Sequence, residues 1–214
     1  GHGRGAVGAG AGSCRWISTD QLRQQPAVDL SETEAADVRF LREEEKLARD
    51  VYRAMSEAHA LPVFSNIARA EQRHMDAVGL LISRYGLEDP VTDDAPGAFT
   101  NSELRSLYDE LVVRGTASLE AALRVGATVE DMDLADLLDM ADSSGNADID
   151  LVVSALAAGS RNHLRAFSRV LARHGFEPYA ATFLDADTVA EILTQDHERG
   201  GMHGQRAAKT GRCG

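Results

Sequence analysis

The sequence is poor in cysteine and in aromatic residues, and it has no long apolar run. Its 214 residues include two cysteines, Cys14 and Cys213, and no C-x-x-C pair, which excludes a zinc ribbon or a rubredoxin-type iron site. Aromatic residues make up only 5% of the chain, so aliphatic side chains and alanine must fill the core. Because no stretch is long and apolar enough to span a bilayer, we expect no membrane partner and one domain with a sizeable core.

Basic charge is also scarce, since the formal net charge is -12. This excess of acid argues against nucleic acid or an anionic membrane surface as a partner. The ends differ from the middle, because residues 1–12 are nearly all glycine and alanine and the last residues are glycine-rich and basic. We therefore interpret 1–30 as a disordered tail with its lead-in, 31–197 as the folded domain and 198–214 as a second disordered tail.

Two sharper interpretations of the tails stay open. Cys14 and Cys213 can pair in a disulfide if the protein matures outside the cytoplasm, and His2, His197 and His203 can collect metal weakly. The chain begins Gly-His-Gly-Arg, with neither Met nor an apolar signal segment. Removal of a leader, and hence a location outside the cytoplasm, is slightly preferred to a cytoplasmic location.

Apolar periodicity and capping signals predict an all-α protein. Ser31-x-x-Glu34 and Thr100-x-x-Glu103 are capping boxes that should begin two of the helices. Four long helices are expected, with an extra helix between the second and third and a short helix at the C-terminal end. Their predicted ranges are 31–59, 63–85, 101–114, 117–141, 148–174 and 185–196.

Each long predicted helix carries a polar interruption near the middle of its apolar stripe. In the second helix the stripe of Phe64, Ile67 and Val78 continues through Glu71 and His74, so a carboxylate and an imidazole share the face toward the core. Glu-x-x-His on an inward face is a recurrent metal-ligand spacing in helical bundles. The interruptions of the four helices are Glu45; Glu71 and His74; Glu130 and Asp133; and Ser160 and His163.

Three consecutive acids in the first long helix differ in their expected surroundings. Glu45 interrupts the main apolar stripe, which continues through Tyr52. Glu44 lies on a neighbouring stripe, so it is the rival candidate for a ligand. Glu43 lies off the stripe, and we expect it to be solvated.

The four interruptions should meet at one level. If the first two helices form a hairpin about Leu61, Glu45 lies 16 residues before the turn and His74 lies 13 after it. At about 1.5 Å per residue the mismatch is only about 4–5 Å. Glu130 and Ser160 each lie 15 residues from the second hairpin turn, so all four groups can gather in one layer.

Such a layer of acids needs positive charge. Each unpaired buried carboxylate costs several kcal/mol, whereas a whole domain is stable by only about 5–15 kcal/mol. The stripes carry no Arg or Lys between the acids, so a divalent or trivalent metal is the economical solution. Oxygen and imidazole ligands without thiolates suit iron or manganese, with zinc as a further option. The alternative is a plain helical bundle whose acids are protonated or paired.

The sequence resembles the ferritin-like di-iron carboxylate proteins, and the rubrerythrin group in particular. Glu45-x-x-Ala48-Arg49-x-x-Tyr52 looks like that group's first-helix ligand motif, which favours Glu45 over Glu44 as a ligand. The resemblance implies a ferritin-like four-helix bundle in which the loop and the helix of 101–114 form the long crossover.

The other helices carry matching motifs. Glu71-x-x-His74 matches the second-helix motif of the group, and His163 matches its fourth-helix histidine. Glu130-x-x-Asp133 is similar to the third-helix Glu-x-x-Glu. More closely, residues 32–200 are similar to the uncharacterised ferritin-like family DUF2202, through the stretches 42–52, 71–75, 97–101 and 159–167.

One position departs from the di-iron pattern, because the fourth helix reads Ser160-x-x-His163 where the group has Glu-x-x-His. We therefore expect one metal, or two with Asp133 compensating, or a metal without redox chemistry. The resemblance implies one or two iron ions bound by Glu45, Glu71, His74, Glu130 and His163, with Asp133 as auxiliary ligand and Tyr52 as a nearby hydrogen-bond donor or radical sink.

The function implied by the resemblance is that of a non-haem iron oxidoreductase of ferroxidase or peroxidase type, acting on Fe(II), dioxygen or peroxide. Without a rubredoxin-like module, turnover would need an external electron donor. A homodimer is a further expectation. The competing hypothesis is a bundle that binds or sequesters metal without catalysis.

Overall fold

The computed structural model describes residues 17, 19–24 and 28–198. Within these residues there are seven helices and no strand, which confirms the all-α prediction. The helices are α1 (Thr19–Arg23), α2 (Glu32–His59), α3 (Pro62–Arg84), α4 (Ser102–Thr116), α5 (Leu119–Ser143), α6 (Ala147–Arg173) and α7 (Ala186–Thr194).

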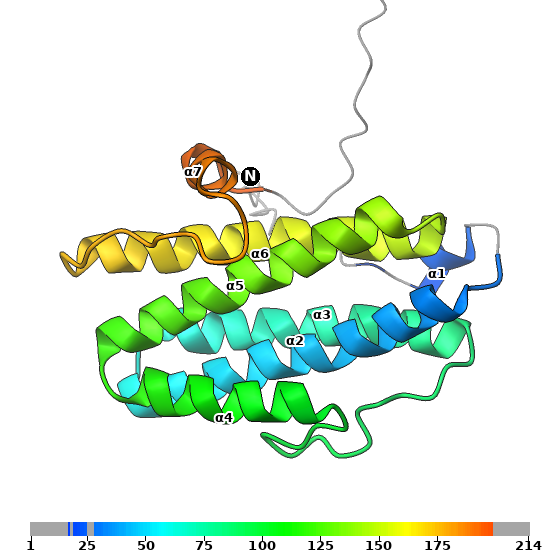
Figure 1. Cartoon of the computed structure of the whole chain (residues 1–214), viewed down its shortest axis with the longest axis horizontal. Helices are drawn as coiled ribbons and strands as arrows, with labels where there is room; N and C mark the ends of the chain where they lie inside the picture. The colour runs from blue at the N-terminus through cyan, green and yellow to red at the C-terminus, as the bar shows by residue number, and fades with distance from the viewer. Residues whose placement is uncertain (1–16, 18, 25–27, 199–214) are drawn as a thin grey trace, which may run out of the picture.

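The four long helices pack as two hairpins (Figure 1). α2 packs mainly on α3, and α5 packs mainly on α6, while α3 and α6 join the two pairs. α4 lies in the connection between α3 and α5 and packs against α2 and α5. α7 packs on the outer side of α6.

The predicted start of the first long helix is confirmed. The Ser31 backbone N–H donates to Glu34 Oε2 at 2.8 Å, and the Ser31 hydroxyl accepts from the Glu34 N–H at 3.2 Å, which is a complete capping box. α3 begins with Pro62 in its first turn and is followed by Gly86, whose φ of 61° suits a helix end.

The capping box predicted at Thr100 and Glu103 is wrong. Asn101 caps α4 instead, by accepting from the Glu103 backbone N–H at 2.8 Å. The Thr100 hydroxyl instead donates to the Pro90 carbonyl at 2.7 Å, and the Thr100 N–H donates to Glu43. The loop before α4 is therefore tied both to itself and to α2.

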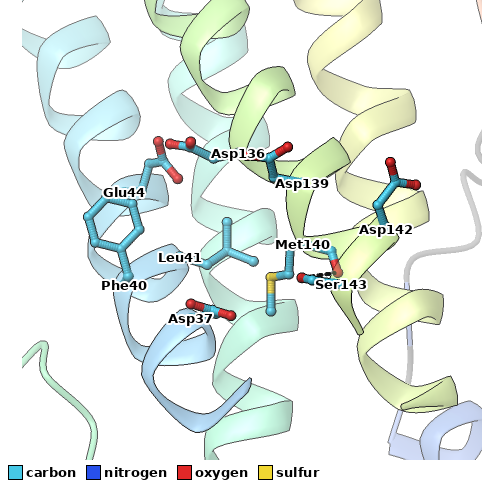
Figure 2. A pocket seen from close by; sticks show the side chains of 9 residues that line it. All are labelled: Asp37, Phe40, Leu41, Glu44, Asp136, Asp139, Met140, Asp142 and Ser143. Atoms are coloured by element: carbon cyan, nitrogen blue, oxygen red, sulfur yellow. Dashed lines mark hydrogen bonds between the residues drawn. The ribbon is translucent and has the colours of Figure 1, made fainter. Parts of the chain in front are cut away.

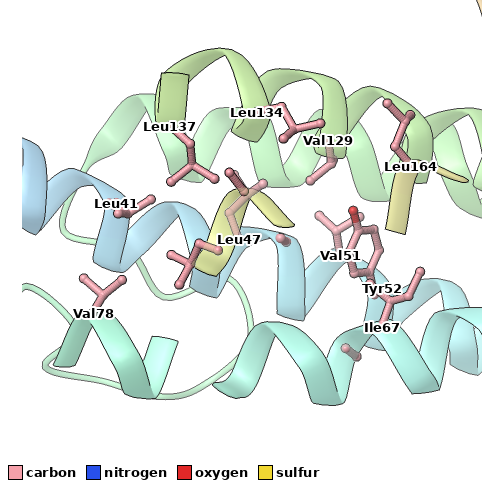
Figure 3. Packing of buried hydrophobic residues seen from close by; sticks show 14 of the residues in the cluster. Leu41, Leu47, Val51, Tyr52, Ile67, Val78, Val129, Leu134, Leu137 and Leu164 are labelled. Atoms are coloured by element: carbon pink, nitrogen blue, oxygen red, sulfur yellow. The ribbon is translucent and has the colours of Figure 1, made fainter. Parts of the chain in front are cut away.

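The apolar core extends along the long helices (Figure 3). Leu41, Val78 and Leu137 pack toward one end of the long helices, and Tyr52 and Ile67 pack toward the other. Two further aromatic rings, those of Phe64 and Phe167, stand 5.7 Å apart, and the second lies 5.3 Å from the ring of Tyr52. Layers of apolar side chains thus separate the polar layer from water along the axis of the helices.

The lead-in contains a short helix that the sequence patterns did not predict. Leu22 of α1 is buried in the core, so this part of the lead-in packs on the folded domain. No helix among the described residues combines the length and the apolar character needed to cross a membrane. Predictions that concern Cys14, Cys213, His2 and His203 lie outside the described residues.

Candidate metal centre

Five side chains from four helices converge in the polar layer. Glu45 comes from α2, Glu71 and His74 from α3, Glu130 from α5 and His163 from α6. They form two groups of three, in each of which the ligand atoms lie within 4.8 Å of one another, and Glu71 belongs to both groups. We call these five residues the Glu71 centre. Its first four members are at most 2% exposed, and the His163 side chain is 12% exposed.

Glu71 divides the centre into two similar halves. Its Oε2 lies 2.7 Å from His74 Nδ1, and its Oε1 lies 2.8 Å from His163 Nδ1. On the far side, Glu45 Oε2 is 3.3 Å from His74 Nδ1 and Glu130 Oε2 is 3.3 Å from His163 Nδ1. The two imidazoles are stacked with centroids 5.5 Å apart. Each half therefore offers one imidazole nitrogen and two carboxylate oxygens, with Glu71 shared between them.

A glycine on α6 makes room for the ring of His74. A Cβ added to Gly159 would stand 2.5 Å from His74 Nε2, closer than a Cβ atom comes to the atoms packed against it. His74 thus turns Nε2 toward the α6 backbone and Nδ1 toward Glu71. Sequence reasoning assigned Gly159 no role. The available signal was a glycine inside a predicted helix, which costs up to about 1 kcal/mol relative to alanine and so usually has a packing reason.

Tyr52 holds Glu130 rather than facing the histidines. Its hydroxyl donates to Glu130 Oε1 and also lies 3.2 Å from the Gly126 carbonyl. Burial and the Glu130 charge raise the pKa of Tyr52 well above its ordinary value. The phenol therefore stays protonated and orients one ligand of the centre.

Asp133 and Ser160 border the centre without joining either group. Asp133 is buried, and its Oδ1 has no hydrogen-bond partner. Burial and the charges of Glu45 and Glu130 raise the pKa of Asp133 well above its ordinary value, although the Ser160 hydroxyl lowers it. Ser160 Oγ donates to the Leu156 carbonyl at 3.1 Å. Asp133 is thus a buried carboxyl group beside the centre whose Oδ1 is free to accept a hydrogen bond or to bind a metal ion.

The three consecutive acids of α2 face three different surroundings. The expectation that Glu43 is solvated is wrong, because it is buried and accepts from the backbone N–H groups of Thr100 and, at 3.0 Å, of Asn101. Glu45 faces the centre. Glu44 is buried as well, yet neither of its carboxylate oxygens has a hydrogen-bond partner.

The pKa values show how the centre is charged without metal. Burial raises the pKa of Glu45 to about 7, although His74 lowers it. Burial also acts to raise the pKa of Glu71, but the charges of His163 and His74 outweigh it and hold that pKa well below its usual range. Burial would lower the pKa of His163, but Glu71 and Glu130 raise it to about 10. Without metal, the positive charge that balances the carboxylates of the centre therefore comes from protonated histidine.

The residues fit a metal by three observations. In the described part of the chain, the basic groups within ion-pair distance of the centre's carboxylates are its two imidazoles. Glu45 Oε1 and Glu71 Oε1 are buried and have no hydrogen-bond partner. Glu71 Oε1 lies 2.8 Å from His163 Nδ1, but not in hydrogen-bond geometry. The donor set is oxygen and imidazole nitrogen, which suits iron, manganese or zinc.

A family model described as "Uncharacterized protein domain (DUF2202)" matches residues 34–196, a range that contains the whole centre. The uncharacterized protein MJ0754 of Methanocaldococcus jannaschii is 43% identical over 181 residues, which are 85% of this chain and 97% of that protein. The crystal structure of hypothetical protein MJ0754 superposes with a TM-score of 0.79, covering 81% of this chain and 98% of that one. Neither name states an activity.

Proposed function

The chain belongs to the DUF2202 family, and from the geometry of the Glu71 centre we propose that it is a metal-binding protein built as a ferritin-like four-helix bundle. α2, α3, α5 and α6 would be the four helices of the bundle, and α4 with its loop would be the long crossover. The support is that each of these helices gives a ligand-type side chain to one buried layer.

The observation that carries the proposal is the position of Glu71 between two histidines. Its two oxygens face the Nδ1 atoms of His74 and His163, so one carboxylate can serve two metal positions. Glu45 would complete the first position and Glu130 the second. Asp133 would be an auxiliary ligand that compensates for Ser160.

Iron is the metal we propose, with manganese or zinc as substitutes. Bound there, iron would supply one-electron redox chemistry toward dioxygen or peroxide. The chain's own part is to hold the ligands apart from bulk water, to keep Tyr52 protonated against Glu130, and to exchange imidazolium protons for the metal. Since the sequence has no C-x-x-C pair for a rubredoxin-like site, an external donor would provide the electrons for oxidoreductase turnover.

A non-catalytic role in metal binding or sequestration is the second candidate. It is favoured by the burial of Glu45, Glu71, His74 and Glu130, which are all at most 2% exposed and leave little room for a substrate beside the metal. Oxygen uptake separates the two roles. Turnover of Fe(II) over many equivalents supports the oxidoreductase, whereas uptake that stops once the centre is filled supports sequestration.

The test of metal binding is the double variant Glu71→Ala and His74→Ala, analysed for metal content after loading with Fe(II) without oxygen. We expect tight binding to be lost, because the variant removes the shared carboxylate and one imidazole. Asp76→Ala, which removes an exposed carboxylate from the same helix, is the matched control and should keep the wild-type content. Equal metal content in the double variant and in the control would contradict the proposal.

A further inference from the structure

A pocket lined by acids lies between α2 and α5 (Figure 2). Its cavity volume is about 530 Å³. Its walls include three apolar side chains, those of Phe40, Leu41 and Met140, and no basic residue is among the described residues that line it. The acids that line the pocket are Asp37, Glu44, Asp136, Asp139 and Asp142.

The acids of this acidic pocket differ in their exposure. Asp136, Asp139 and Asp142 are exposed and Asp37 is half-buried, whereas Glu44 is 1% exposed. One-sign charge along a cleft with apolar walls concentrates counter-ions, because the low-dielectric walls focus the field. The pocket should therefore attract cations, and Glu44 is the most buried of its acids.

Glu44 has no partner for its charge among the residues that line this pocket. Neither carboxylate oxygen has a hydrogen-bond partner, and Figure 2 shows the carboxyl group facing that of Asp136 across the space between α2 and α5. Two facing carboxylates without a donor repel each other unless a proton or a cation lies between them.

Asp133 connects the pocket to the Glu71 centre. It is buried, and it lies one helical turn after Glu130 and one helical turn before Asp136 on α5. Its Oδ1 has no hydrogen-bond partner. Glu130, Asp133 and Asp136 therefore place carboxyl groups on successive turns of α5, from the centre to the pocket.

We propose that Glu44 and Asp136 bind a hydrated divalent cation in the acidic pocket and that cations pass from there to the Glu71 centre. Glu44 is in neither group of three converging ligand atoms, so water fills the remaining coordination positions and the cation stays exchangeable. Cation binding at Glu44 stands by itself, whereas its role in the access route rests on the proposed function.

Equilibrium titration with Mn²⁺, followed by electron paramagnetic resonance of the free ion, tests the binding. Wild type should show a tight class of sites and one weaker site. Glu44→Gln should lose the weaker site alone, and Asp136→Asn should weaken it. Glu110→Gln, which removes an exposed acid from α4, is the matched control and should bind as wild type does.

The titration distinguishes the failure of the two proposals. Glu71→Ala with His74→Ala should remove the tight class and leave the weaker site. Retention of every site in Glu44→Gln overturns the pocket site and leaves the proposed function intact. If the Glu71 and His74 double variant keeps the tight class of sites, the proposed function is overturned instead.

The access role is tested by the rate at which Co²⁺ fills the centre, followed by its visible absorbance in stopped flow. Glu44→Gln should fill the centre about 10-fold more slowly, since charge focusing accounts for roughly 10- to 1,000-fold in association rate. The final absorbance should equal that of wild type. A rate equal to those of wild type and Glu110→Gln would overturn the access role.

Discussion

Helix α2 carries two buried polar clusters of opposite character. In the first, Asp50 meets Lys46 Nζ at 2.6 Å and Arg49 Nη2 at 2.9 Å, and all three side chains are fully buried. Lys46 also donates to the Ala95 carbonyl at 2.8 Å. We call these three residues the Asp50 cluster. In the second, Glu45 meets only His74 among the described basic groups, at 3.3 Å.

The difference between the clusters lies in where the positive charge comes from. The Asp50 cluster contains its own cations, so it fastens α2 to the loop before α4 and needs nothing from outside. The Glu71 centre contains several carboxyl groups and two imidazoles, so its charge is balanced only when protons or metal ions enter. Burial of charged groups alone does not indicate a ligand site. It does so when, as in the Glu71 centre, the chain supplies too few opposite charges to balance them.

The largest expected effect comes from breaking the Asp50 cluster. Asp50→Ala should lower the free energy of unfolding by about 3–5 kcal/mol, because it leaves two buried cations without their shared partner. The loss should be the same with and without metal. Chemical denaturation measures it, with Asp76→Ala as the exposed control. A loss below about 1 kcal/mol would show that Lys46 and Arg49 are satisfied without Asp50.

The stability of the metal-free protein should depend on pH through the Glu71 centre. The pKa of Glu45 is raised to about 7 in the fold, so the folded state holds the proton more tightly than the unfolded state. The resulting stability is complete below about pH 4.3, the ordinary pKa of Glu, and is lost as the pH rises through 7. The loss is on the order of 3 kcal/mol, at 1.36 kcal/mol per pKa unit.

Glu45→Gln checks this pH effect. In the presence of a chelator, the variant should lose less stability than wild type between pH 4.5 and 8, by roughly that same 3 kcal/mol. With metal the trend should reverse, because metal binding displaces protons and strengthens with pH. Parallel curves for wild type and Glu45→Gln would contradict the raised pKa.

The sequence predicted those parts of the fold and centre that follow from helical periodicity. Stripes of apolar residues fixed the long helices, and Glu45, Glu71 and His74 were found because they interrupt such stripes. The structure brings them together with Glu130 and His163, while their role as metal ligands stays a prediction. The predicted convergence agrees with the structure because the height of each residue above its hairpin turn depends only on residue counts and on the helical rise.

The remainder depends on contacts between distant segments. Glu43 is buried by Thr100 and Asn101, which lie 57 and 58 positions further along the chain, so no local pattern could show it. Gly159 matters because of a ring on another helix, and periodicity says nothing of such a contact.

Gly159→Ala tests whether close packing of α6 against His74 matters for metal binding. The new Cβ would displace the ring of His74, and we expect a loss of about 10- to 100-fold in metal affinity and of about 1–3 kcal/mol in stability. Gly79→Ala on α3 is the matched control, since its Cβ would meet the Arg42 side chain at an ordinary 3.7 Å. Titration calorimetry and thermal unfolding measure the two effects. Similar affinities for both variants would show that the ring can move freely.

The smallest expected effect belongs to Tyr52→Phe. The variant removes the hydrogen bond to Glu130 and leaves the ring contact with Phe167. We expect a loss of about 1–2 kcal/mol in stability and a moderate fall in metal affinity, without loss of binding. A complete loss of metal would mean that Tyr52 contacts the metal rather than positioning Glu130.

Anomalous scattering at the iron absorption edge, from crystals of the protein loaded with Fe(II), tests the central claim most directly. The geometry predicts density in the buried layer on the two sides of the Glu71 carboxylate, one position facing His74 Nδ1 and the other facing His163 Nδ1. A map from fully loaded protein with no anomalous density in that layer, or with density only at the surface, would contradict it.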